Sequence, residues 1–136
     1  MGGETAEVDL GGIATQLARL AERVDQDAVL LRRGRILNAT CHLIIGDASV
    51  LLRIVDGRVH EVRHGSFVTP STDFAISGDA AVWRRLLAAS PPPGDHDLLA
   101  FAKRRELQLS GDLHPLISHL SYWKGLLAHL RAETGR

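Results

Sequence analysis

The sequence has only one cysteine, Cys41, and few aromatic residues, which make up 4% of the chain. A single cysteine excludes an internal disulfide, and its place in an apolar strand pattern is typical of a small core residue. There is no run of about 18 consecutive apolar residues, the length that a membrane-spanning helix needs. The first twelve residues also lack the basic start and apolar centre of a secretion signal. We therefore expect a soluble, cytoplasmic protein.

An excess of charge of one sign is also missing. The chain has 16 Lys and Arg residues and 16 Asp and Glu residues, so its formal net charge at pH 7 is zero. Without a net positive field, no long-range attraction draws it to nucleic acid or to an acidic membrane. Two local basic clusters, Arg32-Arg33-Arg35 and Lys103-Arg104-Arg105, are interpreted as solvated faces in preference to binding patches. We expect no nucleic-acid partner.

Motifs of catalysis and metal binding are missing as well. The sequence has neither the Gly-x-Ser-x-Gly turn of a hydrolase nor a glycine-rich phosphate loop. His60 and His64 share a strand face, but at about 3.3 Å per residue they lie about 13 Å apart, too far to hold one ion. Cys41 and His42 are adjacent on a strand and point to opposite faces, which forbids a dyad. We expect no catalytic residue, no metal site and no cofactor.

What is present suits one domain with one core, because the 136 residues are 45% apolar and 24% charged. Residues 1–12 are expected to form a flexible lead, and residues 13–131 the domain. Helical spacing of apolar residues predicts an amphipathic helix over Ile13, Leu17, Leu20 and Val24. Asp25 and Asp27 are candidate caps of a further short helix that ends near Gly34.

Two adjoining stretches, "ILNATCHLIIGD" (36–47) and "ASVLLRIVDGRVHEVRHG" (48–65), are rich in Val, Ile and Leu. Polar breaks at Gly46-Asp47 and Asp56-Gly57 divide them into three strands, and Asp-Gly is a strong signal for a two-residue hairpin. The pattern predicts a three-stranded antiparallel meander. The following "SFVTPST" (66–72) has no periodicity and is predicted to be a loop or crossover.

A short phrase then occurs twice, as "FAISGDAAVWRRLLA" (74–88) and "ELQLSGDLHPLISHL" (106–120). Each copy predicts a strand, a sharp turn at glycine and a helix whose N-terminus is capped by Asp79 or Asp112. Three prolines between the copies end the first helix, and Asp95 is expected to cap a short helix after them. We expect the two copies to lie side by side in one sheet, joined by a right-handed crossover.

Residues 113–130 are predicted to form one final helix. At about 100° per residue its apolar side chains cover an arc of about 180°, and they are Leu113, Leu116, Ile117, Leu120, Trp123, Leu126, Leu127 and Leu130. This arc is wider than a single core-facing stripe. It either packs against both the sheet and the first helix, or in part lines a ligand cavity. His119 falls within the arc, as a buried histidine bonded to a backbone carbonyl or as a contact for a ligand head group.

The order of these elements, together with "VDGRV", "TDFAISGDAAVWRRLL" and "LQLSGDLHPLISHL", resembles the sterol carrier protein 2 family of lipid-binding domains. The matching features are the hairpin at Asp56-Gly57, the strand and helix from Phe74 to Trp83, and Gly111-Asp112 before the last helix. The resemblance spans residues 13–130. It departs at the chain end, "AETGR", which lacks a peroxisomal Ser-Lys-Leu signal.

The resemblance implies an α+β fold: a single five-stranded, mostly antiparallel sheet with helices packed on one face, enclosing an apolar tunnel. It implies a non-catalytic carrier of a sterol, fatty acyl or quinone-like ligand, held between the sheet and helices 79–89, 95–104 and 113–130. It leaves open a transient membrane contact. The predicted wall residues are Leu52, Ile54, Phe74, Trp83, Leu87, Phe101, Leu116, Leu120 and Trp123, although both tryptophans also suit plain core positions.

An alternative of another class is an accessory subunit that carries no free ligand. In that case the apolar arc of the last helix binds another protein, such as an enzyme acting on lipids or quinones, or a second copy of the chain. An enzyme in its own right would need a polar cluster in the cavity, which the sequence does not display. Fold analogy does not decide among these functions, because function belongs to the site.

Overall fold

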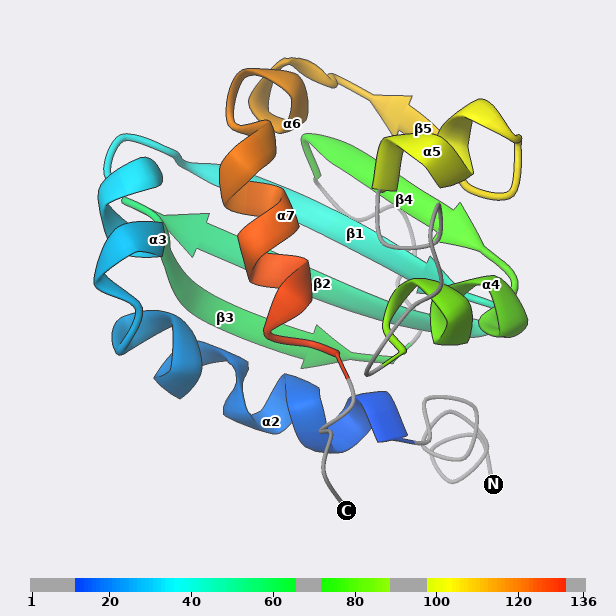
Figure 1. The fold of residues 1–136 in the computed structure, drawn as a ribbon, viewed down its shortest axis with the longest axis horizontal. Helices are drawn as coiled ribbons and strands as arrows, with labels where there is room; N and C mark the ends of the chain where they lie inside the picture. Colours follow the sequence, from blue (N-terminus) through cyan, green and yellow to red (C-terminus); the bar gives the residue numbers. More distant parts are fainter. Residues whose placement is uncertain (1–11, 66–71, 89–97, 132–136) are drawn as a thin grey trace.

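Five strands and six helices make up the residues that the computed structural model describes, namely 12–65, 72–88 and 98–131 (Figure 1). The helices are α2 (Gly12–Asp25), α3 (Ala28–Arg33), α4 (Ala80–Leu86), α5 (Leu98–Lys103), α6 (His114–Ser118) and α7 (Leu120–Ala128). The strands are β1 (Ala39–Ile45), β2 (Ala48–Val55), β3 (Arg58–His64), β4 (Phe74–Gly78) and β5 (Gln108–Gly111). Most of the predicted lead, the segment 66–71 and the expected cap Asp95 lie outside the described residues.

The sheet has the strand order β3-β2-β1-β4-β5. The neighbours pair antiparallel except for β1 and β4, which are parallel. This confirms the predicted α+β class, with one mostly antiparallel sheet and a meander at β1, β2 and β3. Cys41 lies opposite Leu52 on one side and Phe74 on the other, so the register places the three in one row across the sheet.

The hairpins turn where the sequence predicts. Gly46 (φ 61°), Asp56 (φ 53°) and Gly57 (φ 80°) all adopt the left-handed conformation, which hairpin turns of this length use. Gly57 is also constrained by space, because a Cβ there would lie 2.5 Å from the carbonyl oxygen of Gly34. The β2–β3 turn is therefore held against the end of α3 by backbone contact that only glycine permits.

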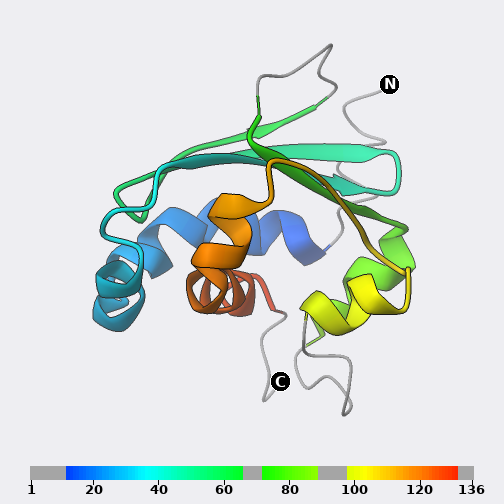
Figure 2. The same ribbon diagram turned by 90° about the horizontal axis from the view of Figure 1, so that it is seen from above.

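Alternation along the strands separates two faces of the sheet. On β1, Ala39, Cys41, Leu43 and Ile45 are buried, whereas the residues between them are half-buried. All described helices lie on the side of these buried residues (Figure 2), and α2 packs along β3. We call this side the covered face and the opposite side the open face.

The repeated phrase folds as two strands that are neighbours, as expected, but β4 and β5 run antiparallel. The predicted right-handed crossover between them is therefore wrong, since that rule concerns parallel strands. Gly111 (φ 88°) ends β5 with its Cα so close to Asp73 that a Cβ would lie 2.7 Å from the Asp73 carbonyl oxygen. The second glycine of the repeat is thus required where β5 meets the start of β4.

The aspartates of the repeat differ in their roles. Asp112 Oδ1 accepts the His114 N–H at 3.0 Å, although the cap position of α6 is the next residue, Leu113. Asp79 stands at the N-terminal cap of α4 as predicted, but its side chain accepts no capping bond there, so that part of the prediction is wrong. The prediction for the short helix is confirmed at Asp27, whose carboxylate accepts the Leu30 N–H at 3.1 Å. Asp25 instead pairs with Arg58 at 2.8 Å.

The single final helix predicted for residues 113–130 is also wrong. The chain leaves helical geometry at His119 (φ −124°, ψ 39°), which separates α6 from α7. In a continuous helix the Pro115 carbonyl would accept the N–H of His119, four residues on. Here it accepts the Trp123 indole N–H at 3.1 Å. The break changes the direction in which the side chains of α7 point. The apolar arc predicted for one straight helix therefore does not describe them.

Candidate functional site

The predicted wall residues come together on the covered face. They come from β2 (Leu52 and Ile54), β4 (Phe74), α4 and its end (Trp83 and Leu87), α5 (Phe101), α6 (Leu116) and α7 (Leu120 and Trp123). Eight of the nine are buried, and Leu120 is partly buried against the same core. The structure therefore unites in one apolar cluster all nine residues that the sequence pattern selected. Their contact with a ligand stays a prediction.

Aromatic rings form the centre of this cluster. The ring of Trp123 meets Phe74 edge-on, with centroids 5.1 Å apart, and meets Tyr122 in the same way at 5.5 Å. Such edge-to-face pairs are favourable beyond the area they bury. Because Phe74 belongs to the sheet and Trp123 to α7, this contact joins the two layers between which a ligand is expected.

The polar atoms of Trp83, Tyr122 and Trp123 all donate hydrogen bonds to backbone carbonyls. The Trp83 indole N–H donates to Ile44 O at 2.9 Å, and the Tyr122 hydroxyl donates to Gly57 O at 2.6 Å. The Trp123 indole N–H donates to the Pro115 carbonyl, as described above. Such hydrogen bonds offset the cost of removing these polar groups from water. What the three side chains present to the cluster is therefore apolar surface.

Tyr122 is the site residue that sequence reasoning missed. On a straight helix of residues 113–130 it falls outside the apolar arc, whereas Ile117 falls inside it. The structure reverses both, because Tyr122 is 1% exposed and Ile117 is 53% exposed. The break at His119 accounts for Tyr122, since it changes the direction of every side chain after it. Ile117 precedes the break and stands at the edge of the predicted arc. Pro115, followed by a polar Ser118-His119 pair, is the only signal in the sequence for that break.

His119 itself is half-buried at the break, with Nδ1 3.1 Å from the Ser118 hydroxyl oxygen. The expected bond to a backbone carbonyl is replaced by this side-chain contact. Of the apolar arc, the described side chains are buried or half-buried except for Ile117. The apolar stripe proposed for partner binding is thus covered by this chain's own sheet and helices.

Two guanidinium groups cover Phe101, one of the predicted wall residues. Arg104 and Arg85 lie over its ring at 4.7 and 5.2 Å from the centroid. Both also bind Glu106, each at 2.8 Å. The bonds from Arg85 and then Arg104 hold the pKa of Glu106 below its usual value. This arrangement links α4, α5 and the approach to β5, so part of the cluster Lys103-Arg104-Arg105 has a structural role.

Burial favours the uncharged form of two adjacent titratable groups of β1, Cys41 and His42. Burial, and to a lesser extent the charge of Asp73, raises the pKa of the Cys41 thiol. The thiol is therefore protonated and inert at neutral pH. His42 lies on the open face, as expected from its adjacency to Cys41, and burial lowers its pKa. Within the described ranges, no three His, Cys, Asp or Glu side chains are placed to hold a metal ion.

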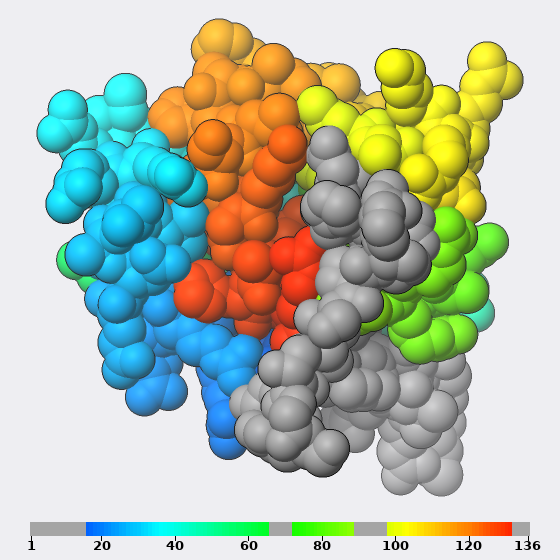
Figure 3. All heavy atoms as spheres, viewed as in Figure 1, coloured from blue at the N-terminus to red at the C-terminus, as the bar shows by residue number. Residues whose placement is uncertain are grey.

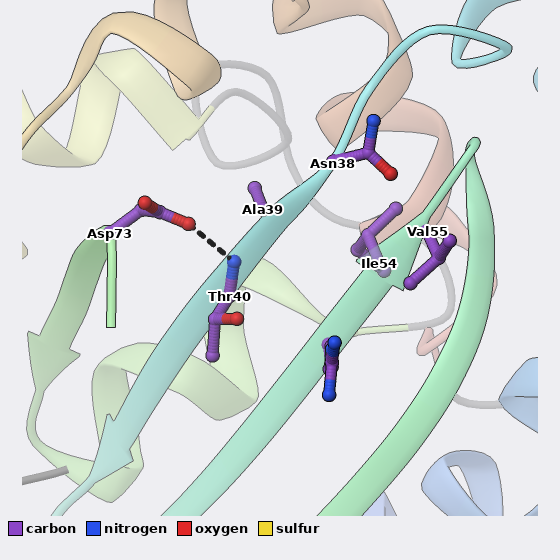
Figure 4. Close-up of a pocket in the computed structure, with 7 residues that line it drawn as sticks. Asn38, Ala39, Thr40, Ile54, Val55 and Asp73 are labelled. Atoms are coloured by element: carbon purple, nitrogen blue, oxygen red, sulfur yellow. Dashed lines mark hydrogen bonds between the residues drawn. The ribbon is translucent and has the colours of Figure 1, made fainter. Parts of the chain in front are cut away.

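A pocket of a different kind lies where β1 begins and β2 ends (Figure 4). Its volume is about 290 Å³, and its lining residues are Asn38, Ala39, Thr40, Arg53, Ile54, Val55 and Asp73. Asp73 Oδ2 accepts the Thr40 N–H at 2.7 Å, and Asn38 Oδ1 accepts the Asp56 N–H at 3.1 Å. These polar groups secure the ends of strands, and a pocket so lined does not suit an apolar ligand.

The similarity of this chain to known proteins lies in its fold. No protein-family model matches it, and no characterised protein matches it in sequence. Among solved structures, it matches sterol carrier protein 2 with a TM-score of 0.71 and 16% identity, over 88% of this chain and 96% of that one. No described helix has the length and apolar character needed to cross a membrane.

Two further structures are similar. A conserved protein from Thermus thermophilus matches with a TM-score of 0.66 and 14% identity, over 89% of this chain and 90% of that one. The UbiJ-SCP2 ubiquinone synthesis protein matches with a TM-score of 0.57 and 17% identity, over 88% and 95%. The resemblance predicted from the sequence is confirmed: the chain has the fold of sterol carrier protein 2 domains.

Proposed function

We propose that this chain is a non-catalytic carrier that binds a sterol, fatty acyl or quinone-like ligand on the covered face, between the sheet and α4, α5, α6 and α7. The observation that carries the proposal is the single apolar cluster at that place in a sterol carrier protein 2 fold. Ligand pockets of this kind are mostly apolar with few polar groups. The tunnel predicted from the resemblance is part of this proposal.

Two of the similar structures narrow the ligand class. One is a sterol carrier protein and another is a ubiquinone synthesis protein, and both names refer to apolar molecules with a small polar end. The described wall provides apolar side chains, with its tryptophan and tyrosine polar atoms already bonded to the backbone. Binding would therefore rest on apolar burial, worth about 25 cal/mol per Å² before the costs of association.

The experiment is native mass spectrometry of the freshly purified protein, followed by organic extraction and identification of what is released. We expect an adduct with the mass of a sterol, fatty acid or quinone. Leu120→Gln, at a partly buried position, should reduce the adduct, and Ile117→Gln, three residues earlier and exposed, should leave it unchanged. Both variants are checked for folding by circular dichroism.

A bare chain mass that stays bare after incubation with fatty acids, sterols and quinones would refute the carrier. The accessory-subunit alternative would then lead, supported by the similarity to the ubiquinone synthesis protein. A partner or a second copy would have to use a surface other than the buried side of α6 and α7, and light scattering would show whether the chain is dimeric.

A further inference from the structure

The open face of the sheet carries the polar pocket, which the proposed carrier does not use (Figure 4). Its volume of about 290 Å³ is at the small end for a ligand site, so its occupant would be a small polar molecule. Figure 3 looks onto the covered face, where atoms of the helices lie in front of most of the sheet. The pocket and the carrier cluster therefore lie on different sides of the strands, although the buried Ile54 belongs to both.

Three polar residues form a row across this pocket. Arg53 of β2 lies opposite Thr40 of β1 in the sheet register. Asp73 lies on the other side of Thr40, because the Thr40 N–H donates to Asp73 Oδ2 at 2.7 Å and the Asp73 N–H donates to Thr40 O at 2.8 Å. Neighbouring strands are about 4.8 Å apart, so the Cα atoms of Arg53 and Asp73 are about 10 Å apart. A cation and an anion thus stand at the two ends of the row.

The two charges of this row have no ionic partner within the described ranges. Arg53 and Asp73 are both exposed, and neither forms an ion pair there, with each other or with another residue. Glu61 stands opposite Arg53 on β3 but pairs with Arg63, at 3.6 Å. The bond from the Thr40 N–H holds the Asp73 carboxylate in place without neutralising it. A cation and a positioned anion therefore face one pocket without pairing.

We propose that the pocket binds a small zwitterion of the amino acid type. Its carboxylate lies on the Arg53 guanidinium, which presents parallel N–H donors to such a group, and its ammonium donates to the Asp73 carboxylate. The charged ends of an amino acid are one carbon apart, and the long arginine side chain spans most of the row, so one ligand meets both charges. A free anion fits less well, because Asp73 and the nearby Glu61 would repel it, and Arg53 would repel a metal cation.

Two uncharged polar groups and one apolar side chain complete the pocket. Asn38 Oδ1 accepts the Asp56 N–H at 3.1 Å, which leaves the two N–H donors of the Asn38 amide for a carboxylate. The Thr40 hydroxyl, a donor and an acceptor, belongs to the residue between the two charges. Val55 is half-buried and offers apolar surface to the side chain of the ligand. Polar groups placed in this way fix the orientation of a bound molecule.

The test is a heteronuclear NMR titration of the full chain with L-alanine at neutral pH. Propionate lacks the ammonium of alanine and ethylamine lacks its carboxylate, so each of these probes keeps one half of the interaction. We expect saturable shifts of the Thr40 and Asp73 amide signals with alanine. Either half-molecule should bind about fivefold more weakly, the upper range for the loss of one exposed ion pair. The titration contains no lipid, so its failure and the failure of the carrier proposal are distinguishable.

Two variants separate the roles of the charges. Arg53→Gln should weaken alanine binding about fivefold and leave ethylamine binding unchanged. Asp73→Asn, which keeps an acceptor for the Thr40 N–H, should weaken alanine binding to a similar extent and leave propionate binding unchanged. Arg84→Gln, at an exposed position of α4, is the matched loss of charge and should bind alanine as wild type does. The proposal is overturned if alanine gives no saturable shift, if propionate binds as tightly as alanine, or if Arg84→Gln weakens binding as much as Arg53→Gln.

Discussion

The two faces of the sheet, made by alternate residues of the same strands, have opposite characters. On the covered face Cys41, Leu52 and Phe74 form a buried row beneath the helices. One residue along, Thr40 and Arg53 face each other on the open face, beside a polar pocket. A shift of one residue changes the face of every side chain. The comparison therefore favours the covered face as the side on which the proposed apolar ligand would bind.

The largest difference between the faces should be in stability. Leu52→Ala removes a fully buried side chain and is expected to lower the free energy of unfolding by about 2–5 kcal/mol. Arg53→Ala, its exposed neighbour on the same strand, should change it by no more than about 0.5 kcal/mol. Urea denaturation of both variants measures the contrast. Comparable losses would show that the open face is also covered in the folded protein.

A smaller effect is expected where the covered face is linked to the β2–β3 turn. Tyr122→Phe keeps the ring but deletes the hydroxyl that donates to Gly57 O. The buried carbonyl loses its donor, so the variant should lose about 1–3 kcal/mol of unfolding free energy. A stability equal to that of wild type in urea denaturation would indicate that this bond contributes nothing.

The difference in stability between wild type and Tyr122→Phe should also depend on pH above the ordinary tyrosine pKa. Burial raises the pKa of Tyr122 above its ordinary value of 10.0. A group whose pKa is raised in the folded state contributes stability below its ordinary pKa and loses that contribution as pH rises above it. Wild type should therefore approach the Tyr122→Phe variant in stability above about pH 10. A gap that stays constant with pH would contradict this role.

The smallest change in stability is expected at the start of α3, where the Asp27 side chain is only partly buried. Asp27→Ala removes the cap and should cost about 1 kcal/mol at neutral pH, whereas Asp27→Asn keeps a capping side chain and serves as the control. The bond to His129, followed by the bond to the Leu30 N–H, lowers the pKa of Asp27. Its contribution is therefore present above the ordinary value of 3.8 and is lost as pH falls through the lower folded value.

Unfolding measured over an acid pH series checks this sign. The gap between wild type and Asp27→Ala should narrow as pH falls below about 4. A gap that widens on acidification would mean that the protonated carboxyl is the form that the fold prefers.

Much of the fold was predictable because it follows from local patterns. Alternation over 39–45 and the run rich in Val, Ile and Leu over 48–55, with Asp56-Gly57 between strands, predict the meander. The nine wall residues were selected by the same periodicity, and the structure brings them into one cluster. For Leu52, Ile54 and Phe74 the period sufficed because a strand residue has only two faces to choose from. The other six lie on or at the end of short helices, where apolar spacing indicates the buried side.

The rest depended on contacts between segments far apart in the sequence. Nothing in a wheel over 113–130 shows that the Trp123 indole N–H donates to the Pro115 carbonyl, or that the helix breaks at His119 and so turns Tyr122 into the core. The antiparallel pairing of β4 and β5 likewise depends on how the chain returns to Asp73, which no strand pattern encodes. Arg32, Arg33 and Arg35 could be recognised as a cluster, but only the folded surface shows that no carboxylate within the described ranges forms an ion pair with them.

The most direct test of the central claim is photo-crosslinking with diazirine analogues of a fatty acid, a sterol and a prenylquinone, followed by peptide mapping. We predict that at least one probe labels peptides of the covered face, around Trp83 and Leu87 or from Leu116 to Trp123, and that the unlabelled parent molecule competes. Labelling at Thr40 and Arg53 on the open face, or no competed labelling by any probe, would contradict the claim.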